Sequence, residues 1–135
     1  MKATNTISQK KGMTLLELTV VILVLLTLIS VLFIGAKAWK DGADRSNCIL
    51  NIRNFQVATR SYANMNATAD GATIAVSALT GAGNFLASFP VCPSSGTYTP
   101  LASGDVTYET DSGTVFLSCN STTGGTHAPS NPAGW

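Results

Sequence analysis

The sequence has few charged residues, and one half of it has no basic residue at all. Only 11% of its 135 residues are charged, against about 25% in an average soluble domain. All eight Lys and Arg residues lie between Lys2 and Arg60, so the chain from Ser61 to Trp135 carries only acids. A surface without Lys or Arg has nothing with which to neutralise phosphates. We therefore expect no nucleic-acid partner.

Charge is also nearly absent from one long hydrophobic segment. Residues 13–36 contain a single charged side chain, Glu17, and residues 18–34 contain no charge, Gly or Pro. About 20 apolar residues in a helix span the hydrocarbon core of a bilayer. Basic residues precede the segment, which favours a cytoplasmic N-terminus and a translocated C-terminal part. We expect a single-pass inner-membrane protein whose C-terminal domain is periplasmic.

Three interpretations of this segment differ in how they explain Glu17. A secretory signal peptide would have a shorter apolar core and a small-x-small cleavage site, so this interpretation is disfavoured. A plain membrane anchor explains the hydrophobicity. Glu17 would then reach the membrane interface, where a carboxylate costs less than the about 2.5–3.5 kcal/mol it costs at the bilayer centre. The third interpretation uses the whole string KKGMTLLE, residues 10–17.

The string KKGMTLLE resembles the class III leader of type IV pilins and type II secretion pseudopilins. The resemblance implies that residues 1–12 are a leader peptide, which a prepilin peptidase removes by cutting between Gly12 and Met13. Met13 would then be N-methylated, and Glu17 would be the acid at the fifth mature position. In that superfamily, an inner-membrane assembly platform builds filaments from copies of the subunit and from other pilin-like subunits. Glu17 would pair with the new α-ammonium group of a neighbouring subunit, because an unpaired buried charge is costly.

The segment that follows the apolar run has the pattern of an amphipathic helix. Apolar residues recur there at steps of three, four and seven, which places them on one helical face. The predicted buried face consists of Cys48, Ile52, Phe55 and Tyr62, with Ala58 and Met65 at its flanks. We predict one helix from about Thr14 to Met65, in which residues 13–36 form the transmembrane or filament-core part. Residues 37–65 would continue it into a globular domain.

Residues 66–135 contain short runs rich in Val, Thr, Tyr and Phe, separated by turns with Gly and Ser. We predict a short helix around Ser77–Leu86 and strands at Thr97–Leu101, Val106–Thr110 and Thr114–Cys119. These strands would form a three-stranded antiparallel meander packed on the long helix, followed by an irregular surface tail. The fold class is therefore α+β and pilin-like. The candidate core residues are Phe89, Val91, Tyr98, Val106, Tyr108, Val115 and Leu117.

The chain has three Cys residues, an odd number, all beyond the apolar segment. In an oxidising compartment we favour a disulfide between Cys92 and Cys119, which would close a loop across the sheet and stabilise it by about 3 kcal/mol. Cys48 would then be a small buried residue on the helix. Pairing of Cys48 with either of the others is the alternative. Zinc binding by the three Cys and His127 is disfavoured, because no C-x-x-C spacing is present.

The remaining polar residues give little sign of chemistry. Asp105, Glu109 and Asp111 are interpreted as ordinary turn residues, with calcium binding as a weak alternative. His127 is the only His and has no evident nucleophile or acid near it in the sequence. We therefore predict that the protein is not an enzyme and needs no cofactor.

The function expected from this sequence is that of a structural subunit in a pilus-like or pseudopilus filament. A type II secretion pseudopilin or a minor pilin is slightly favoured. A type IV pilus pilin for adhesion, motility or DNA uptake is the first alternative. A monomeric membrane-anchored periplasmic binding module is an alternative of a different class, in which Gly12 and its fixed distance from Glu17 would have no purpose.

Overall fold

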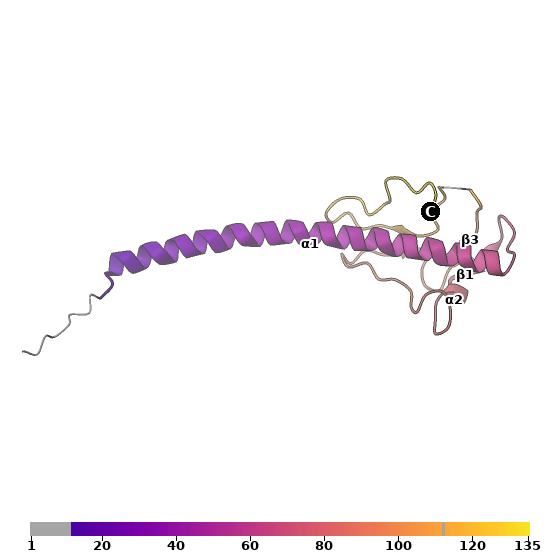
Figure 1. Cartoon of the computed structure of the whole chain (residues 1–135), viewed down its shortest axis with the longest axis horizontal. Coiled ribbons are helices and arrows are strands. Elements are labelled where there is room, and N and C mark those ends of the chain that lie inside the picture. Colours follow the sequence, from indigo (N-terminus) through magenta and orange to yellow (C-terminus); the bar gives the residue numbers. More distant parts are fainter. Residues whose placement is uncertain (1–11, 112) are drawn as a thin grey trace, which may run out of the picture. The chain divides into compact units, whose positions relative to one another are not determined.

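A computed structural model describes residues 12–111 and 113–135. The chain divides into two compact units, the first ending at Lys37 and the second running from Ala38 to Trp135. The regular elements are α1 (Leu15–Met65), β1 (Thr73–Ala75), α2 (Val76–Leu79), β2 (Tyr98–Thr99), β3 (Asp105–Thr107) and β4 (Ser118–Cys119). Figure 1 labels α1, α2, β1 and β3 along the chain. The predicted α+β class, with a long N-terminal helix and small antiparallel sheets, is confirmed.

The helix α1 begins and ends close to the predicted residues, and local hydrogen bonds account for both ends. At its start, the Glu17 backbone N–H donates to Thr14 Oγ1 over 3.3 Å, so that Thr14 caps the first turn. At its end, Ala67 takes a positive φ of 48°, and the Thr68 N–H turns back to the Ala63 carbonyl over 2.9 Å. A left-handed residue directly after the last turn is a common way to end a helix.

The part of α1 that lies in the second unit buries one face. Cys48, Ile52 and Phe55 are fully buried, Ala58 is buried, and Tyr62 packs against the core. Met65 was predicted at the flank of this face but is 77% exposed, because it is the last helical residue and the chain turns away after it. The same face also buries residues that hydrophobic periodicity does not detect, namely Gln56, Thr59 and Ala63.

The sheet differs from the predicted three-stranded meander. The second unit has two separate antiparallel ladders, one between β1 and β3 and the other between β2 and β4. In the first, Ile74 pairs with Val106, and in the second, Tyr98 pairs with Cys119. The strand β1 lies in a segment for which the sequence predicted no strand. β2 ends after two residues because Pro100 follows and has no N–H to donate.

A helix side chain takes the place of a strand partner for the segment before β4. The Gln56 Nε2 donates to the Thr114 carbonyl, and Gln56 Oε1 accepts from the Phe116 N–H over 3.0 Å. These backbone groups would otherwise need a neighbouring strand. The predicted strand Thr114–Cys119 is therefore reduced to β4, and its first half is attached directly to α1.

Replacing Gln56 by Leu should lower the free energy of unfolding by about 2–3 kcal/mol, because both backbone groups lose their partner. The change can be followed by urea unfolding of the detergent-extracted full chain. Asn54→Leu is the matched control. It also replaces a side-chain amide by Leu, and Asn54 lies on the same helix but is exposed. Equal stability of the two variants would mean that the Gln56 hydrogen bonds contribute nothing net.

Most of the predicted core residues are in the core. Tyr98, Val106, Tyr108 and Leu117 are buried, and Phe89 and Val115 are partly buried against them. Val91 is the exception at 79% exposure. Its neighbour Cys92 turns inward instead, so Val91 faces outward. The sequence missed Ile74, Val76, Leu79 and Phe116, which complete the core, and the predicted helix at Ser77–Leu86 is only the short α2.

The last residues, after β4, have no regular structure but are not simply a surface tail. The Arg45 Nε donates to the Thr126 carbonyl over 2.8 Å, and the guanidinium of Arg53 lies 5.8 Å from the Trp135 ring. Gly124 has a φ of +75°, and a Cβ there would come within 2.7 Å of the Asp41 carbonyl. The chain therefore needs Gly at this point to lie close against α1. This contact brings the one His of the sequence into the interior.

Candidate functional site

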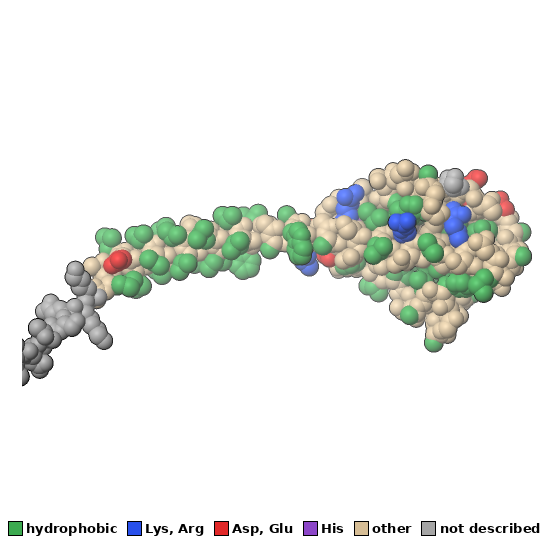
Figure 2. All heavy atoms as spheres, viewed as in Figure 1, with side chains coloured by type: hydrophobic (Ala, Val, Ile, Leu, Met, Phe, Trp, Pro, Cys, Tyr) green, Lys and Arg blue, Asp and Glu red, His purple; other side chains and the backbone are tan. Residues whose placement is uncertain are grey.

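The described part of the first unit is an apolar helical segment in which no described residue is buried. Every large hydrophobic residue between Met13 and Ile34 is exposed. Figure 2 shows hydrophobic side chains over the visible face of this segment. By length and composition α1 contains a stretch that is able to cross a membrane. The few hydroxyls in it are satisfied internally, because Thr19, Thr27 and Ser30 each donate to a carbonyl three or four residues earlier.

Glu17 lies in the first turn of this segment. Thr14 is the N-cap and Glu17 is the third helical residue, which is the spacing of a capping box. A negative charge in the first turn is also favourable for the helix dipole. Among residues 12–111 and 113–135, no hydrogen bond or ion pair reaches the Glu17 carboxylate. The carboxylate is therefore available for a group outside these residues.

Gly12 and Met13, where the leader would be cut, precede the first helical residue. Both are exposed and neither is helical. A Cβ added to Gly12 would meet no atom within 4 Å, so the fold does not require Gly at this position. The bond between Gly12 and Met13 therefore lies in irregular, accessible chain directly before α1.

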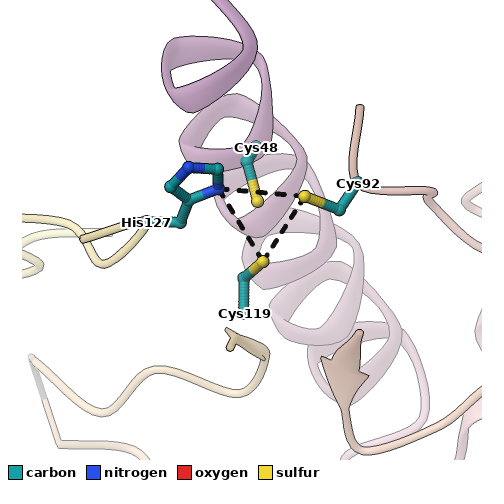
Figure 3. Close-up of side chains that lie close together, drawn as sticks. All are labelled: Cys48, Cys92, Cys119 and His127. Carbon is teal, nitrogen blue, oxygen red and sulfur yellow. Dashed lines mark hydrogen bonds between the residues drawn. The ribbon is translucent and has the colours of Figure 1, made fainter. Parts of the chain in front are cut away.

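Four side chains from distant parts of the sequence meet in the second unit. Cys48 lies on α1, Cys92 in the loop before β2, Cys119 in β4, and His127 in the segment after it. Figure 3 shows their sulfur and nitrogen atoms directed toward a common point. These ligand atoms all lie within 4.8 Å of one another. Cys48 and His127 are fully buried, Cys92 is buried, and Cys119 is partly buried.

The residues predicted to form the disulfide are neighbours in this cluster. The Cys92 and Cys119 sulfurs lie 3.6 Å apart, and all three Cys residues are free thiols. The disulfide between Cys92 and Cys119 therefore stays a prediction. Cys48, for which the sequence favoured a packing role over pairing with another Cys, has its sulfur within 4.8 Å of the other two. His127, for which the sequence showed no partner, completes the group.

The surroundings give the thiols different acidities. Burial raises the pKa of Cys48 to about 12. Burial also acts to raise the pKa of Cys92, but hydrogen bonds from the backbone N–H groups of Ser94 and Gly96 and from the neighbouring thiols outweigh it. The pKa of Cys92 is lowered to about 7. A thiol with such a pKa is substantially ionised near neutral pH.

The acidic residues considered for calcium lie elsewhere. Asp105, Glu109 and Asp111 are exposed, and Glu109 Oε2 accepts a hydrogen bond from Thr114 Oγ1 over 2.9 Å. Within residues 12–111 and 113–135, the cluster of three Cys and His127 is the group with the arrangement of a metal site, and these acids are not part of it. Their positions fit the interpretation as turn residues.

Comparison of the chain with protein-family models, with curated proteins and with solved structures finds no match. The long apolar N-terminal helix and the small antiparallel sheets are nevertheless compatible with a pilin-like architecture.

Proposed function

We propose that this protein is a structural subunit of a pilus-like or pseudopilus filament, assembled from the inner membrane after cleavage between Gly12 and Met13. The observation that carries the proposal is the string KKGMTLLE, whose last three residues begin α1, together with the apolar run up to Ile34, in which every large hydrophobic side chain is exposed. Such a surface is stable only in lipid or against other apolar helices, since its exposure to water would cost about 25 cal/mol per Å². A filament core built from copies of this segment supplies the second environment.

The position of Glu17 supports the same proposal. Cleavage creates an α-ammonium group on Met13, four residues before an acid that has no partner among the described residues. In apolar surroundings both charges are costly unless they meet an opposite charge. Pairing between the Met13 ammonium of one subunit and the Glu17 carboxylate of the next would fix the axial offset of neighbouring helices. A pseudopilin or minor pilin is favoured over a major pilin because the second unit is small and rich in irregular loops.

Mass spectrometry of the N-terminal peptide tests the processing step. The membrane-extracted protein should yield a peptide that begins at N-methylated Met13. Gly12→Val should leave the chain uncleaved by removing the residue before the cut, although the structure has room for the new side chain. Gly35→Ala is the matched control, since it also adds a side chain where no atom lies within 4 Å, and it should be processed normally.

An intact Met1 terminus in cells whose peptidase cleaves its other substrates would contradict the proposal. The chain would then be an uncleaved membrane anchor, and the binding-module alternative would become the better interpretation.

A further inference from the structure

We propose that Cys48, Cys92, Cys119 and His127 bind a zinc ion in a closed, tetrahedral, structural site. This set of ligands, three thiolates and one imidazole, is a standard one for structural zinc. It joins α1, the loop before β2, strand β4 and the C-terminal segment, which share few backbone hydrogen bonds. The proposal concerns the second unit and does not depend on filament assembly.

The distances among the ligand atoms of Cys92, Cys119 and His127 fit a common ion, and the Cys48 sulfur lies within 4.8 Å of each of them. A tetrahedral ion with normal zinc bond lengths places its sulfurs about 3.8 Å apart and a sulfur and a nitrogen about 3.6 Å apart. In the structure the Cys92 and Cys119 sulfurs lie 3.6 Å apart, and His127 Nδ1 lies 3.8 Å from the first and 3.9 Å from the second. A disulfide would require sulfurs about 2.05 Å apart. The side chains are therefore already arranged around a central point (Figure 3).

His127 is held in the state that a metal ligand needs. Its Nε2 lies 2.8 Å from the Thr123 carbonyl oxygen, which can only accept a hydrogen bond, so Nε2 carries the proton. The lone pair is then on Nδ1, which faces the sulfurs. Hydrogen bonding of the second ring nitrogen to a carbonyl is how most metal-binding His residues are oriented. Without a cation, the Nδ1 of this buried imidazole would have only the weak thiol donors of Cys92 and Cys119, 3.8 and 3.9 Å away.

The sulfurs also have supporting donors. Cys92 accepts from the backbone N–H groups of Ser94 and Gly96. Tyr98 Oη accepts from Asn51 Nδ2 over 3.2 Å, which leaves its hydroxyl hydrogen to donate to the Cys48 sulfur 3.1 Å away. A bound divalent cation would counteract the effect of burial on Cys48, because a coordinated thiol is deprotonated.

Gly96 shows how closely the loop packs on the cluster. A Cβ at this residue would come within 2.6 Å of the Ser121 Cβ and 2.8 Å of the Cys119 sulfur, and within 3.1 Å of the Cys92 sulfur. These approaches are too close for any side chain. Gly96 is therefore needed for the segment CPSSG, residues 92–96, to place Cys92 and its backbone donors close to the other ligands.

Zinc fits this site better than a catalytic metal does. All four positions are filled by protein side chains, which leaves none open for a substrate or water. Three buried or partly buried thiols would also reduce copper(II), whereas zinc is not redox-active. A single ion would account for all three Cys residues and for His127. The alternative, a disulfide between Cys92 and Cys119, leaves Cys48 and His127 unexplained.

The first test uses the full chain extracted in detergent without a reductant or a chelator. Metal analysis and native mass spectrometry should find one zinc ion per chain and three alkylatable thiols once the protein is denatured. A chain without zinc in which Cys92 and Cys119 are joined by a disulfide would overturn the proposal.

The second test titrates the reduced, metal-free full chain with Co²⁺ and then with Zn²⁺ in the absence of oxygen. We expect a thiolate-to-cobalt charge-transfer band that saturates at one equivalent and disappears when zinc displaces the cobalt. Cys48→Ser and His127→Ala should each weaken zinc binding by more than about 100-fold, and Tyr98→Phe by about 10–100-fold. A reduced, helical chain that shows no band would also overturn the proposal.

A control variant separates loss of the ligands from loss of the fold. Val106→Ala truncates a buried residue of β3 but leaves the four ligands in place, so it should lower stability while zinc affinity changes less than about threefold. If Cys48→Ser and His127→Ala bind zinc as tightly as the unaltered chain, the ion lies elsewhere and the proposal is wrong. Both substitutions would leave a Cys92–Cys119 disulfide intact, so the two interpretations predict opposite results.

Discussion

Replacing Glu17 by Gln should reduce filament formation by at least about 10-fold while the chain is still cleaved and still inserts into the membrane. Gln preserves the size of the side chain and can occupy the third position of a capping box as Glu does. What it removes is the negative charge that would pair with the Met13 ammonium of a neighbouring subunit. Leaving that ammonium unpaired in an apolar filament core would cost about 3–5 kcal/mol, more than enough for a tenfold loss. Electron microscopy of sheared filaments measures filament formation. Immunoblots of the membrane fraction measure cleavage and insertion.

The choice of Gln separates two roles of the same residue. If Glu17 only caps the helix, Glu17→Gln should form normal filaments, and that result would remove the charge-pairing part of the proposal. If it pairs with a neighbour, Glu17→Gln and Glu17→Ala should be equally defective. Asp44→Asn is the matched control, since it makes the same change from acid to amide in an acid whose carboxylate lies 4.0 Å from the Lys40 ammonium within its own helix. The contact is long and the Lys40 side chain is 75% exposed, so the pair contributes little and filament formation should be unchanged.

Phe55→Ala should cause the largest loss of stability of any single truncation on α1, about 3–5 kcal/mol. Phe55 is fully buried, and its ring packs edge-on against Phe89 with 6.1 Å between the ring centroids. Phe89 in turn packs edge-on against Tyr98, 6.2 Å away. Truncation would therefore leave a cavity between α1 and the loop that leads to β2. A small domain has only about 5–15 kcal/mol of stability to lose.

Unfolding of the detergent-extracted chain in urea, followed by circular dichroism and by the fluorescence of Trp135 in a Trp39→Phe background, measures this loss. Trp135 reports on the second unit because it packs against the core. Leu50→Ala is the control, since Leu50 lies on the same helix but is 53% exposed, and it should change stability by less than about 0.5 kcal/mol. A loss no larger for Phe55→Ala than for Leu50→Ala would mean that the packing of α1 on the loops is not what stabilises this unit.

Local pattern was sufficient for the long helix. The uninterrupted apolar run and the three- and four-residue spacing after it predict α1 to within one residue at its start, because helix hydrogen bonds join residues only four apart. The same periodicity identified Cys48, Ile52 and Phe55 as buried. It could not identify Gln56, whose burial depends on backbone groups at Thr114 and Phe116 that lie about sixty positions further along the chain.

The strands were harder to predict for the same reason. The runs around Tyr98 and Val106 do contain strands, but their partners are β4 and β1, and pairing between distant segments leaves little local signal. The sequence also suggested Val91 as a core residue, whereas the interior position belongs to Cys92 next to it. A shift of one residue is enough to exchange the inward and outward faces of an extended chain.

The sequence by itself determined that this protein has an apolar helix able to span a membrane, one acid in its first turn, and an α+β domain beyond it. These features depend on composition and on spacings of a few residues, which are local properties of the sequence. The tertiary structure alone decided that Cys48, Cys92, Cys119 and His127 meet. They are separated by 44, 27 and 8 positions, so no local spacing indicates a common site. Only the packing of three distant segments against α1 brings their ligand atoms together.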